Sequence, residues 1–377
     1  MKIVCDNKIP YLKGVLEPYA EVVYLPGAQT TPDVVRDADA LVTRTRTICN
    51  EALLKGSAVK VIATATIGYD HIDTKWCEQN GIAWENAPGC NSWSVKQYIA
   101  SVLCVLAQKH GFSLEGTTLG VVGVGNVGSK VAEVASLLGM KVLLNDPPRA
   151  RKEGPEAFVS LDEIMHECDI ITVHVPLQKE GEDATWHLFD EARLAALEPR
   201  QILINSSRGS VVDNRALKDV LKAGGIKGAV LDVWEGEPTL DEELVNLLDI
   251  STMHIAGYSA DGKANGTSMS VQTLARHLGL PLTTWRAEGI PAPVQPLEFS
   301  LDASGKSLQQ VLSEAILYTY DVRDDSNLLR ENLSDFERLR GDYRIRREFT
   351  AFSVRLQGET PEMKETLKKI GFKILND

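Results

Sequence analysis

Polar residues that can bind ligands or exchange protons follow five apolar segments in the central part of the chain. They are Asp146, His174, Ser206–Arg208, Asp232 and His254. A histidine titrates near neutral pH and can take or give a proton, and an arginine can hold a carboxylate with its planar guanidinium. In parallel α/β sheets, ligands bind outside the carboxyl ends of the strands. We therefore expect these residues to line one ligand site.

A glycine-rich turn precedes most of these residues. The apolar run Thr118–Val122 leads into Gly123, Gly125 and Gly128 with the spacing G-x-G-x-x-G, and a second apolar run ends on Asp146. The first glycine permits a tight turn, the second lets the backbone approach a pyrophosphate, and the third lets the following helix pack against the strand. That helix offers free N–H groups to the anion. The pattern predicts a dinucleotide site; a glycine-rich turn in an unrelated α/β domain is the alternative.

Asp146 also predicts which dinucleotide binds. A carboxylate here can accept hydrogen bonds from both adenosine ribose hydroxyls of NAD, and it would repel the 2′-phosphate of NADP. Arg149 and Arg151 could favour a phosphate, but Pro147 and Pro148 are expected to turn them outward. We therefore expect NAD as the cofactor, with NADP as the alternative.

Composition limits the remaining possibilities. A chain of 377 residues is long enough for two or three domains, and its net charge of −12 argues against nucleic acid as a partner. No apolar run approaches the length of a membrane helix. The six cysteines are scattered without metal-site spacing and are expected to be reduced and mostly buried. We expect a soluble, cytoplasmic protein without a bound metal.

Before the glycine-rich turn, short apolar segments alternate with polar or helical ones, which predicts a small α/β unit over residues 1 to about 93. The expected strands are Lys2–Cys5, Glu21–Leu25, Ala40–Thr43, Lys60–Thr64 and Ile82–Glu85. The expected helices are Pro32–Asp37, Glu51–Leu54 and Asp73–Gln79, followed by one long helix over Ser94–His110.

From Thr118 to about Ile255, strands and helices alternate as in a doubly wound parallel sheet. After Asp146 the expected strands are Asp169–His174, Gln201–Asn205, Gly228–Val233 and Ile250–His254.

The last part of the chain, from about Leu282, predicts a small α+β unit. Residues 289–296 have the composition of an extended linker. Beyond the linker we expect a strand at Leu297–Leu301, a helix at Leu308–Tyr320, a polar stretch, a strand at Phe349–Leu356, a helix at Pro361–Ile370 and a short last strand. This unit lacks an evident catalytic motif and is interpreted as an oligomerisation domain, with a passive appendage as the alternative.

Taken together, the motifs resemble the NAD-dependent D-2-hydroxyacid dehydrogenases over roughly residues 40 to 270. The resemblance is carried by Gly68–Asp73, Pro88–Asn91, the glycine-rich turn, His174–Leu177, Asn205–Asp213, Leu231–Pro238 and His254–Gly257. It implies a Rossmann domain inserted in a second, flavodoxin-like α/β substrate domain, with hinges near residues 93–97 and 255–260. The implied division is 1–93 with 258–281 as the substrate domain, 94–257 as the NAD domain and 282–377 as the C-terminal dimerisation domain.

The resemblance also implies roles for three residues. His254 would be the base that removes the hydroxyl proton of a 2-hydroxy acid, and Glu237 would hydrogen-bond the far nitrogen of its ring. Arg208 would bind the carboxylate and polarise the developing carbonyl group. Each residue alone has an ordinary structural explanation, but their order and spacing beside a nucleotide site favour catalysis.

Further residues are expected to bind the two ligands. The expected cofactor-binding residues are Gly123, Gly125, Asn126, Val127, Gly128, Asp146, Val175, Ser206, Asp232 and Gly257. Thr45, Thr66 and Tyr258 are expected to bind a small phosphorylated, polyhydroxylated 2-hydroxy acid. His174 is expected to contact the cofactor through its backbone. Gln97, where many relatives have glutamate, puts the hinge contacts in doubt.

Two other functions remain open. One is a dehydrogenase of the same family that acts on another acid, such as phosphoglycerate. The other is an NAD-sensing binding protein that resembles a transcriptional corepressor. In all cases we expect a homodimer.

Overall fold

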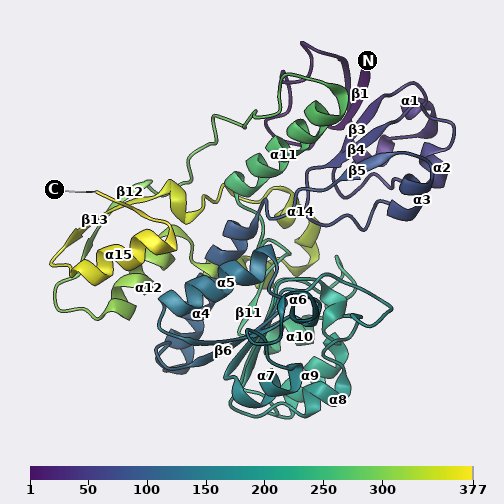
Figure 1. The fold of residues 1–377 in the computed structure, drawn as a ribbon. Helices are drawn as coiled ribbons and strands as arrows, with labels where there is room; N and C mark the ends of the chain where they lie inside the picture. Colours follow the sequence, from purple (N-terminus) through teal and green to yellow (C-terminus); the bar gives the residue numbers. More distant parts are fainter. Residues whose placement is uncertain (376–377) are drawn as a thin grey trace. The chain divides into compact units, whose positions relative to one another are not determined.

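The computed structural model describes residues 1–375, which form two compact units (Figure 1). The first consists of residues 1–91 and 259–291, and the second of residues 92–258 and those from 292 onward. Tyr258 therefore belongs to the second unit, and residues 282–291 belong to the first. The expected division into three domains stays a prediction.

The first unit is built on a parallel sheet of short apolar strands. The strands are β1 (Lys2–Asp6), β2 (Glu21–Leu25), β3 (Ala40–Thr43), β4 (Val61–Thr64) and β5 (Ala83–Glu85). Their order, β2-β1-β3-β4-β5, is the flavodoxin-like order that the family resemblance implies.

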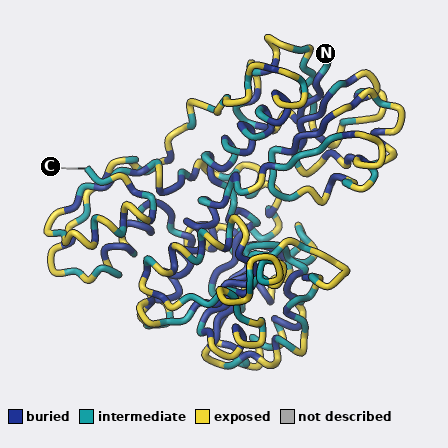
Figure 2. Tube along the Cα trace, in the orientation of Figure 1, coloured by how far each residue is buried: buried dark blue, intermediate teal, exposed yellow. Residues whose placement is uncertain are grey.

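Helices cover this sheet on both faces because side chains along each strand alternate between two cores. Ile3 and Val42 pack with Leu274 of α11 (Ala260–Leu278) on one face. Val4 and Leu41 pack on the other face, against the short helices. These are α1 (Pro32–Val35), α2 (Glu51–Leu54) and α3 (Thr74–Gln79). In Figure 2 the three inner strands, β1, β3 and β4, are mostly dark blue, whereas the connections between the elements are largely exposed and yellow.

The second unit contains the larger parallel sheet. Its strands are β6 (Thr118–Val122), β7 (Lys141–Asn145), β8 (Ile170–Val173), β9 (Ile202–Asn205), β10 (Gly228–Leu231) and β11 (Ile250–Ser251). In the order β11-β10-β9-β8-β6-β7, the direction of winding reverses between β6 and β8. Ligands bind at such a switch point, at the carboxyl ends of the strands. The doubly wound sheet predicted from the sequence is confirmed.

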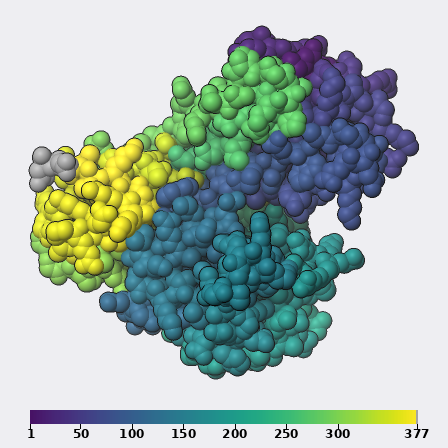
Figure 3. Space-filling view, in the orientation of Figure 1, coloured from purple at the N-terminus to yellow at the C-terminus, as the bar shows by residue number. Residues whose placement is uncertain are grey.

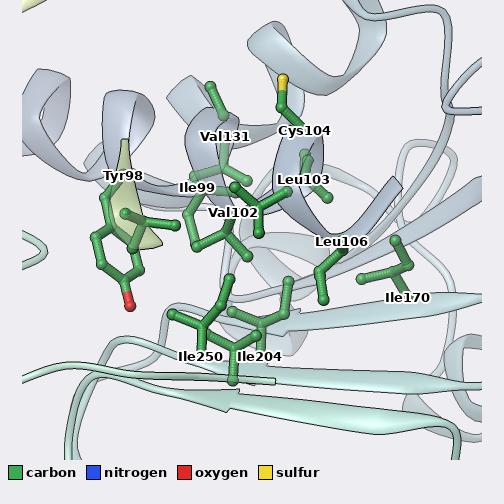
Figure 4. Close-up of a cluster of buried hydrophobic side chains, with 14 of the residues drawn as sticks. Tyr98, Ile99, Val102, Leu103, Cys104, Leu106, Val131, Ile170, Ile204 and Ile250 are labelled. Carbon is green, nitrogen blue, oxygen red and sulfur yellow. The ribbon is translucent and has the colours of Figure 1, made fainter. Parts of the chain in front are cut away.

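Helices flank this sheet and bury its faces. They are α4 (Ser92–His110), α5 (Asn126–Leu137), α6 (Pro147–Glu153), α7 (Leu161–Glu167), α8 (Glu191–Ala195), α9 (Asn214–Lys222) and α10 (Glu242–Leu247). Side chains of α4, including Ile99 and Leu106, point onto the strands at Ile170 and Ile204 (Figure 4). Unlike a surface helix, α4 is buried along most of its length, because the C-terminal segment covers its other side.

The C-terminal segment forms a three-stranded parallel sheet with helices. Its strands are β12 (Glu298–Asp302), β13 (Ser353–Gln357) and β14 (Lys373–Ile374), and its helices are α12 (Leu308–Thr319), α13 (Val322–Glu331), α14 (Phe336–Gly341) and α15 (Pro361–Ile370). The expected polar stretch contains α13 and α14, which were not predicted. The strand expected from Phe349 begins only at Ser353, because residues 349–351 form a turn of 3₁₀ helix.

This segment shares one hydrophobic core with the large sheet. Figure 3 shows the C-terminal residues, in yellow, packed against the blue residues that include α4. Polar groups of α4 also bind the segment: the Gln97 amide donates to the Arg347 carbonyl oxygen (2.9 Å), and the Ser94 hydroxyl donates to Glu348 (2.9 Å). The Gln97 amide thus binds the C-terminal segment.

The cysteines lie inside the protein. All six are buried and none forms a disulfide, so the prediction of buried thiols is confirmed. Burial raises the pKa of the Cys104 thiol to about 11 and that of Cys49 to about 12.

Candidate active site

The glycine-rich turn lies between β6 and α5, at the switch point. A Cβ atom on Gly123, whose φ is +87°, would lie 2.7 Å from the His174 carbonyl oxygen, and one on Gly128 would overlap the Gly123 carbonyl oxygen. At Gly125 the φ angle is −75° and a Cβ atom would meet no protein atom within 4 Å. Gly123 and Gly128 are therefore required by packing, whereas the described residues leave room for a side chain at Gly125. The open space at Gly125 fits a pyrophosphate approaching the backbone.

Two alanine substitutions should separate these roles. Gly128→Ala is expected to destabilise the fold by about 1–3 kcal/mol or more, because its new methyl group has no room. Gly125→Ala is expected to keep the wild-type melting temperature but to weaken NAD binding about tenfold or more, about 1.4 kcal/mol. Thermal melting and fluorescence titration with NADH measure the two effects. Unchanged NAD affinity in Gly125→Ala would contradict the pyrophosphate contact.

Asp146 follows β7 and faces the glycine-rich turn. Its carboxylate accepts hydrogen bonds from the backbone N–H of Val124 (2.8 Å) and from that of Arg149 (3.0 Å), so it also caps α6. The expectation that the prolines turn Arg149 outward is wrong. The Arg149 guanidinium donates to the Val124 carbonyl oxygen (2.6 Å), because the prolines begin α6 and the helix directs this side chain back to the turn.

The residues after β8 border the same turn. The backbone N–H of His174 donates to the Val122 carbonyl oxygen (2.7 Å), and its Nε2 lies 3.0 Å from the Thr172 hydroxyl. Burial lowers the pKa of His174 to about 3, which keeps the ring neutral. The Val175 side chain lies beside the space where a Cβ of Gly123 would stand. Both residues thus border the glycine-rich turn.

The turn after β9 carries Arg208 and is shaped by Asn205, which sequence reasoning did not single out. The Asn205 side chain accepts from the N–H and the hydroxyl of Ser207 (3.0 and 2.9 Å) and donates to the Arg208 carbonyl oxygen (2.9 Å). The Ser206 hydroxyl oxygen is buried and has no hydrogen-bond partner among the described residues. A buried hydroxyl without a partner fits a group bound to a ligand.

The Arg208 turn lies against the segment that carries Glu237. A Cβ atom on Gly209 would overlap the Trp234 carbonyl oxygen, so this glycine permits a close approach of the two backbones. The side chain of Arg208 is partly exposed and donates to the Ser207 carbonyl oxygen (2.8 Å).

His254 and Glu237 form the pair expected from the sequence. Nδ1 of His254 lies 2.9 Å from one carboxylate oxygen of Glu237, and the other oxygen accepts from the backbone N–H of Trp234 (3.0 Å). Burial alone would raise the pKa of Glu237. The hydrogen bond and charge of His254, the Trp234 N–H and the charge of Arg340 have the larger, opposite effect, so the pKa of Glu237 lies below its usual value. An ionised Glu237 accepts a hydrogen bond from Nδ1–H of His254, and in that tautomer the lone pair of Nε2 is available.

The backbone of His254 has an uncommon conformation. Its φ angle is +58°, in the left-handed region that residues other than glycine seldom adopt. Such a conformation costs of order 1–3 kcal/mol and persists only when neighbouring contacts enforce it.

Asp232 enforces the conformation from one side. Its backbone carbonyl oxygen accepts from the N–H of His254 (2.7 Å), and its buried carboxylate accepts from the N–H groups of Ile255 (2.7 Å) and Ala256 (2.9 Å) and from the Thr252 hydroxyl (2.6 Å). The carboxylate is thus largely engaged within the protein.

The predicted residues fall in both units. Gly257 and Tyr258 continue the His254 loop, and the Tyr258 ring meets the edge of Tyr343 at 6.2 Å between centroids. Thr45 and Thr66 lie in the first unit. Thr45 is exposed, and the Thr66 hydroxyl donates to the Gly68 carbonyl oxygen (2.8 Å).

Comparisons with known proteins identify the class to which the chain belongs. Residues 96–256 match the family model "D-isomer specific 2-hydroxyacid dehydrogenase, NAD binding domain", and residues 293–371 match a domain of unknown function. A solved structure of D-lactate dehydrogenase from Aquifex aeolicus, complexed with NAD and lactic acid, is 26% identical, with a TM-score of 0.63, and covers 78% of this chain and 100% of its own. The fold and site thus define an NAD-dependent oxidoreductase of the D-2-hydroxyacid dehydrogenase class.

More similar relatives narrow the class. An erythronate-4-phosphate dehydrogenase of Bacteroides fragilis is 50% identical over 94% of this chain and 99% of its own length. One of Klebsiella pneumoniae is 42% identical over 99% and 98%. This chain belongs to the erythronate-4-phosphate dehydrogenase family. The predictions of an NAD cofactor and of family membership are confirmed. Within residues 1–375, no helix is long and apolar enough to cross a membrane.

Proposed function

We propose that this protein oxidises 4-phospho-D-erythronate with NAD to (R)-3-hydroxy-2-oxo-4-phosphooxybutanoate, a step in pyridoxal 5′-phosphate (vitamin B6) biosynthesis. The observation that carries the chemistry is the His254–Glu237 pair, 2.9 Å apart, in the unit that holds the glycine-rich turn. The choice of substrate is supported by the relatives named erythronate-4-phosphate dehydrogenase, which are 50% and 42% identical to this chain over nearly its full length.

In this proposal His254 is the base. Because Glu237 is ionised and holds the proton-bearing Nδ1, Nε2 of His254 is free to accept the proton of the C2 hydroxyl group. Bound NAD supplies the acceptor for the hydride that leaves C2. In the reverse direction the protonated His254 returns its proton to the carbonyl oxygen.

Arg208 holds the carboxylate of the substrate in this proposal. A guanidinium presents two parallel N–H groups to a carboxylate and also stabilises charge on the neighbouring oxygen as the C2 carbonyl develops. Its backbone is fixed by the amide of Asn205, which supports a preorganised position. Asp232 is proposed to orient the nicotinamide carboxamide. Its carboxylate accepts three hydrogen bonds within the protein and has a further lone pair with which to accept one from the carboxamide.

Substrate selection is proposed for Thr45, Thr66 and Tyr258. Their hydroxyl groups suit a polyhydroxylated acid. We also propose that the protein is a cytoplasmic homodimer. The six buried thiols fit a reducing compartment.

The deciding experiment measures NADH formation with 4-phospho-D-erythronate beside 3-phospho-D-glycerate and D-lactate. A parallel reaction contains a 2-oxo acid as acceptor, so that tightly bound NADH is still turned over. We expect a kcat/KM for 4-phospho-D-erythronate at least about a hundredfold above the other acids, about 2.7 kcal/mol. Turnover only with another acid would overturn the substrate, and NAD binding without any turnover would favour an NAD-sensing protein. Sedimentation of the purified protein tests the homodimer.

A further inference from the structure

The loop that carries His254 is bound by Asp232 through its N–H groups and by the C-terminal segment through its carbonyl groups. Three consecutive carbonyl oxygens of the loop accept hydrogen bonds from arginines of that segment. Arg340 donates from Nε to the His254 carbonyl oxygen (3.3 Å), and Arg346 donates from Nη2 to those of Ile255 (3.2 Å) and Ala256 (2.6 Å). The N–H groups of the same three residues are bound by Asp232.

Arg346 is a buried arginine that lies among aromatic rings and not in a surface salt bridge. It is 2% exposed, and its guanidinium lies 4.5 Å from the centroid of the Tyr320 ring and 5.9 Å from that of Tyr343. Its Nε and Nη1 atoms have no hydrogen-bond partner within residues 1–375. Burying a guanidinium with two unpartnered nitrogens is costly. Among residues 1–375, the hydrogen bonds of this guanidinium go to the carbonyl oxygens of Ile255 and Ala256 in the His254 loop.

The surroundings of Arg346 are themselves fixed. The rings on which it lies donate their hydroxyl groups to Asp325: Tyr320 at 2.8 Å and Tyr343 at 2.6 Å. Asp325 is 1% exposed and also pairs with Arg344 (3.1 Å). The rings that contact the Arg346 guanidinium are therefore themselves held by hydrogen bonds to one buried carboxylate.

We propose that Arg346 and Arg340 are positioning residues for the reaction, which hold His254 in its left-handed conformation through the carbonyl oxygens of its loop. The C-terminal segment then has a function within each active site, beyond oligomerisation. This inference rests on the proposed role of His254 as the base. Hydrogen bonds to both the N–H and the carbonyl groups of its loop keep His254 left-handed. Its imidazole thereby stays directed at Glu237 and the substrate.

The test compares Arg346→Met and Arg340→Met with Arg330→Met. Arg330 is a matched control, because it also reaches from the C-terminal segment to a backbone carbonyl oxygen beside β11, that of Leu248 (2.8 Å), but on a loop without proposed catalytic residues. All variants are made in the full-length protein. Arg346→Lys keeps the positive charge and N–H donors but loses the planar guanidinium, and it replaces Arg346→Met if that variant does not fold.

We expect kcat to fall about ten- to a hundredfold in Arg346→Met, and less in Arg340→Met, while the Kd for NADH changes less than about threefold. Arg346→Lys should recover part of the loss. Arg330→Met should lower the melting temperature but keep kcat within about twofold of the wild type. Equal losses of kcat in Arg330→Met and Arg346→Met, or an unchanged kcat in Arg346→Met, would overturn the inference.

Hydrogen exchange gives a readout that does not depend on turnover. The amides of Ile255 and Ala256 should exchange faster in Arg346→Met than in the wild type, and should be unaffected in Arg330→Met. If the wild type does not oxidise 4-phospho-D-erythronate, the proposed function fails while the exchange data still test the support of the loop. If the wild type is active and the amides of Arg346→Met stay protected, only the inference about the arginines fails.

Discussion

Replacing His254 with asparagine is expected to lower kcat about 10²- to 10⁴-fold, the usual contribution of a general base. Asparagine is the better replacement than alanine because it tolerates a left-handed backbone, so the φ angle of +58° can persist without the imidazole. NADH affinity should stay within about threefold of the wild type, because the glycine-rich turn and Asp146 are untouched. Steady-state kinetics and fluorescence titration measure the two quantities.

A second histidine variant controls for nonspecific loss. His166 is exposed, and its side chain takes no part in the site, so His166→Ala should keep the wild-type kcat. Glu237→Gln should lower kcat less than His254→Asn, because the base remains but loses its ionised partner. If His254→Asn turns over substrate within about tenfold of the wild type, another group must be the base.

The second large effect is expected for Arg208→Ala, which should lower kcat/KM about 10²- to 10³-fold. The loss combines the substrate carboxylate contact with stabilisation of charge at C2. Arg208→Lys should recover little, because an ammonium cannot make the same paired hydrogen bonds. The backbone of the turn should be retained in both variants, since Asn205 binds the carbonyl group of residue 208 and not its side chain.

Arg338→Ala is the matched control for this experiment. Arg338 is 59% exposed and pairs with Asp335 on the surface, so its loss should leave kcat/KM unchanged. Arg149 would be a poor control, because its guanidinium donates to the Val124 carbonyl oxygen within the cofactor turn. Comparable losses in Arg208→Ala and Arg338→Ala would remove Arg208 from its proposed role.

The central sheet could be predicted from the sequence because its signals are local. Strands such as Thr118–Val122 are apolar runs that end on glycine or on a polar residue, and the spacing of Gly123, Gly125 and Gly128 reflects steric demands that act within a few residues. The pairing of His254 with Glu237 was also predicted, but from family resemblance and not from spacing alone.

Helices α13 and α14 were missed because their sequences are rich in charge. The α13 sequence VRDDSNLLRE has few apolar residues, and its helix is stabilised by burying Val322 and Leu329 against distant elements. Tertiary contacts of that kind leave no periodic signal in a short segment.

The support of the site was also hidden from the sequence. Arg346 acts across 90 residues of chain, on the carbonyl oxygen of Ala256. A basic run near the C-terminus is normally a solvated surface, and only the fold brings this one against the His254 loop. Asn205 had a local signal, since an asparagine two residues before a serine often shapes a turn, but its position at a strand end concealed it.

The buried cysteines make this protein suited to site-specific labelling. Because burial raises the thiol pKa of residues such as Cys49 to about 12, few of these thiolates exist at neutral pH to react with a maleimide dye. A cysteine introduced at an exposed position in each unit would therefore be labelled selectively in the otherwise native sequence. Energy transfer between two such dyes would report whether the distance between the dyes changes as NAD and substrate are added, without first removing any native cysteine.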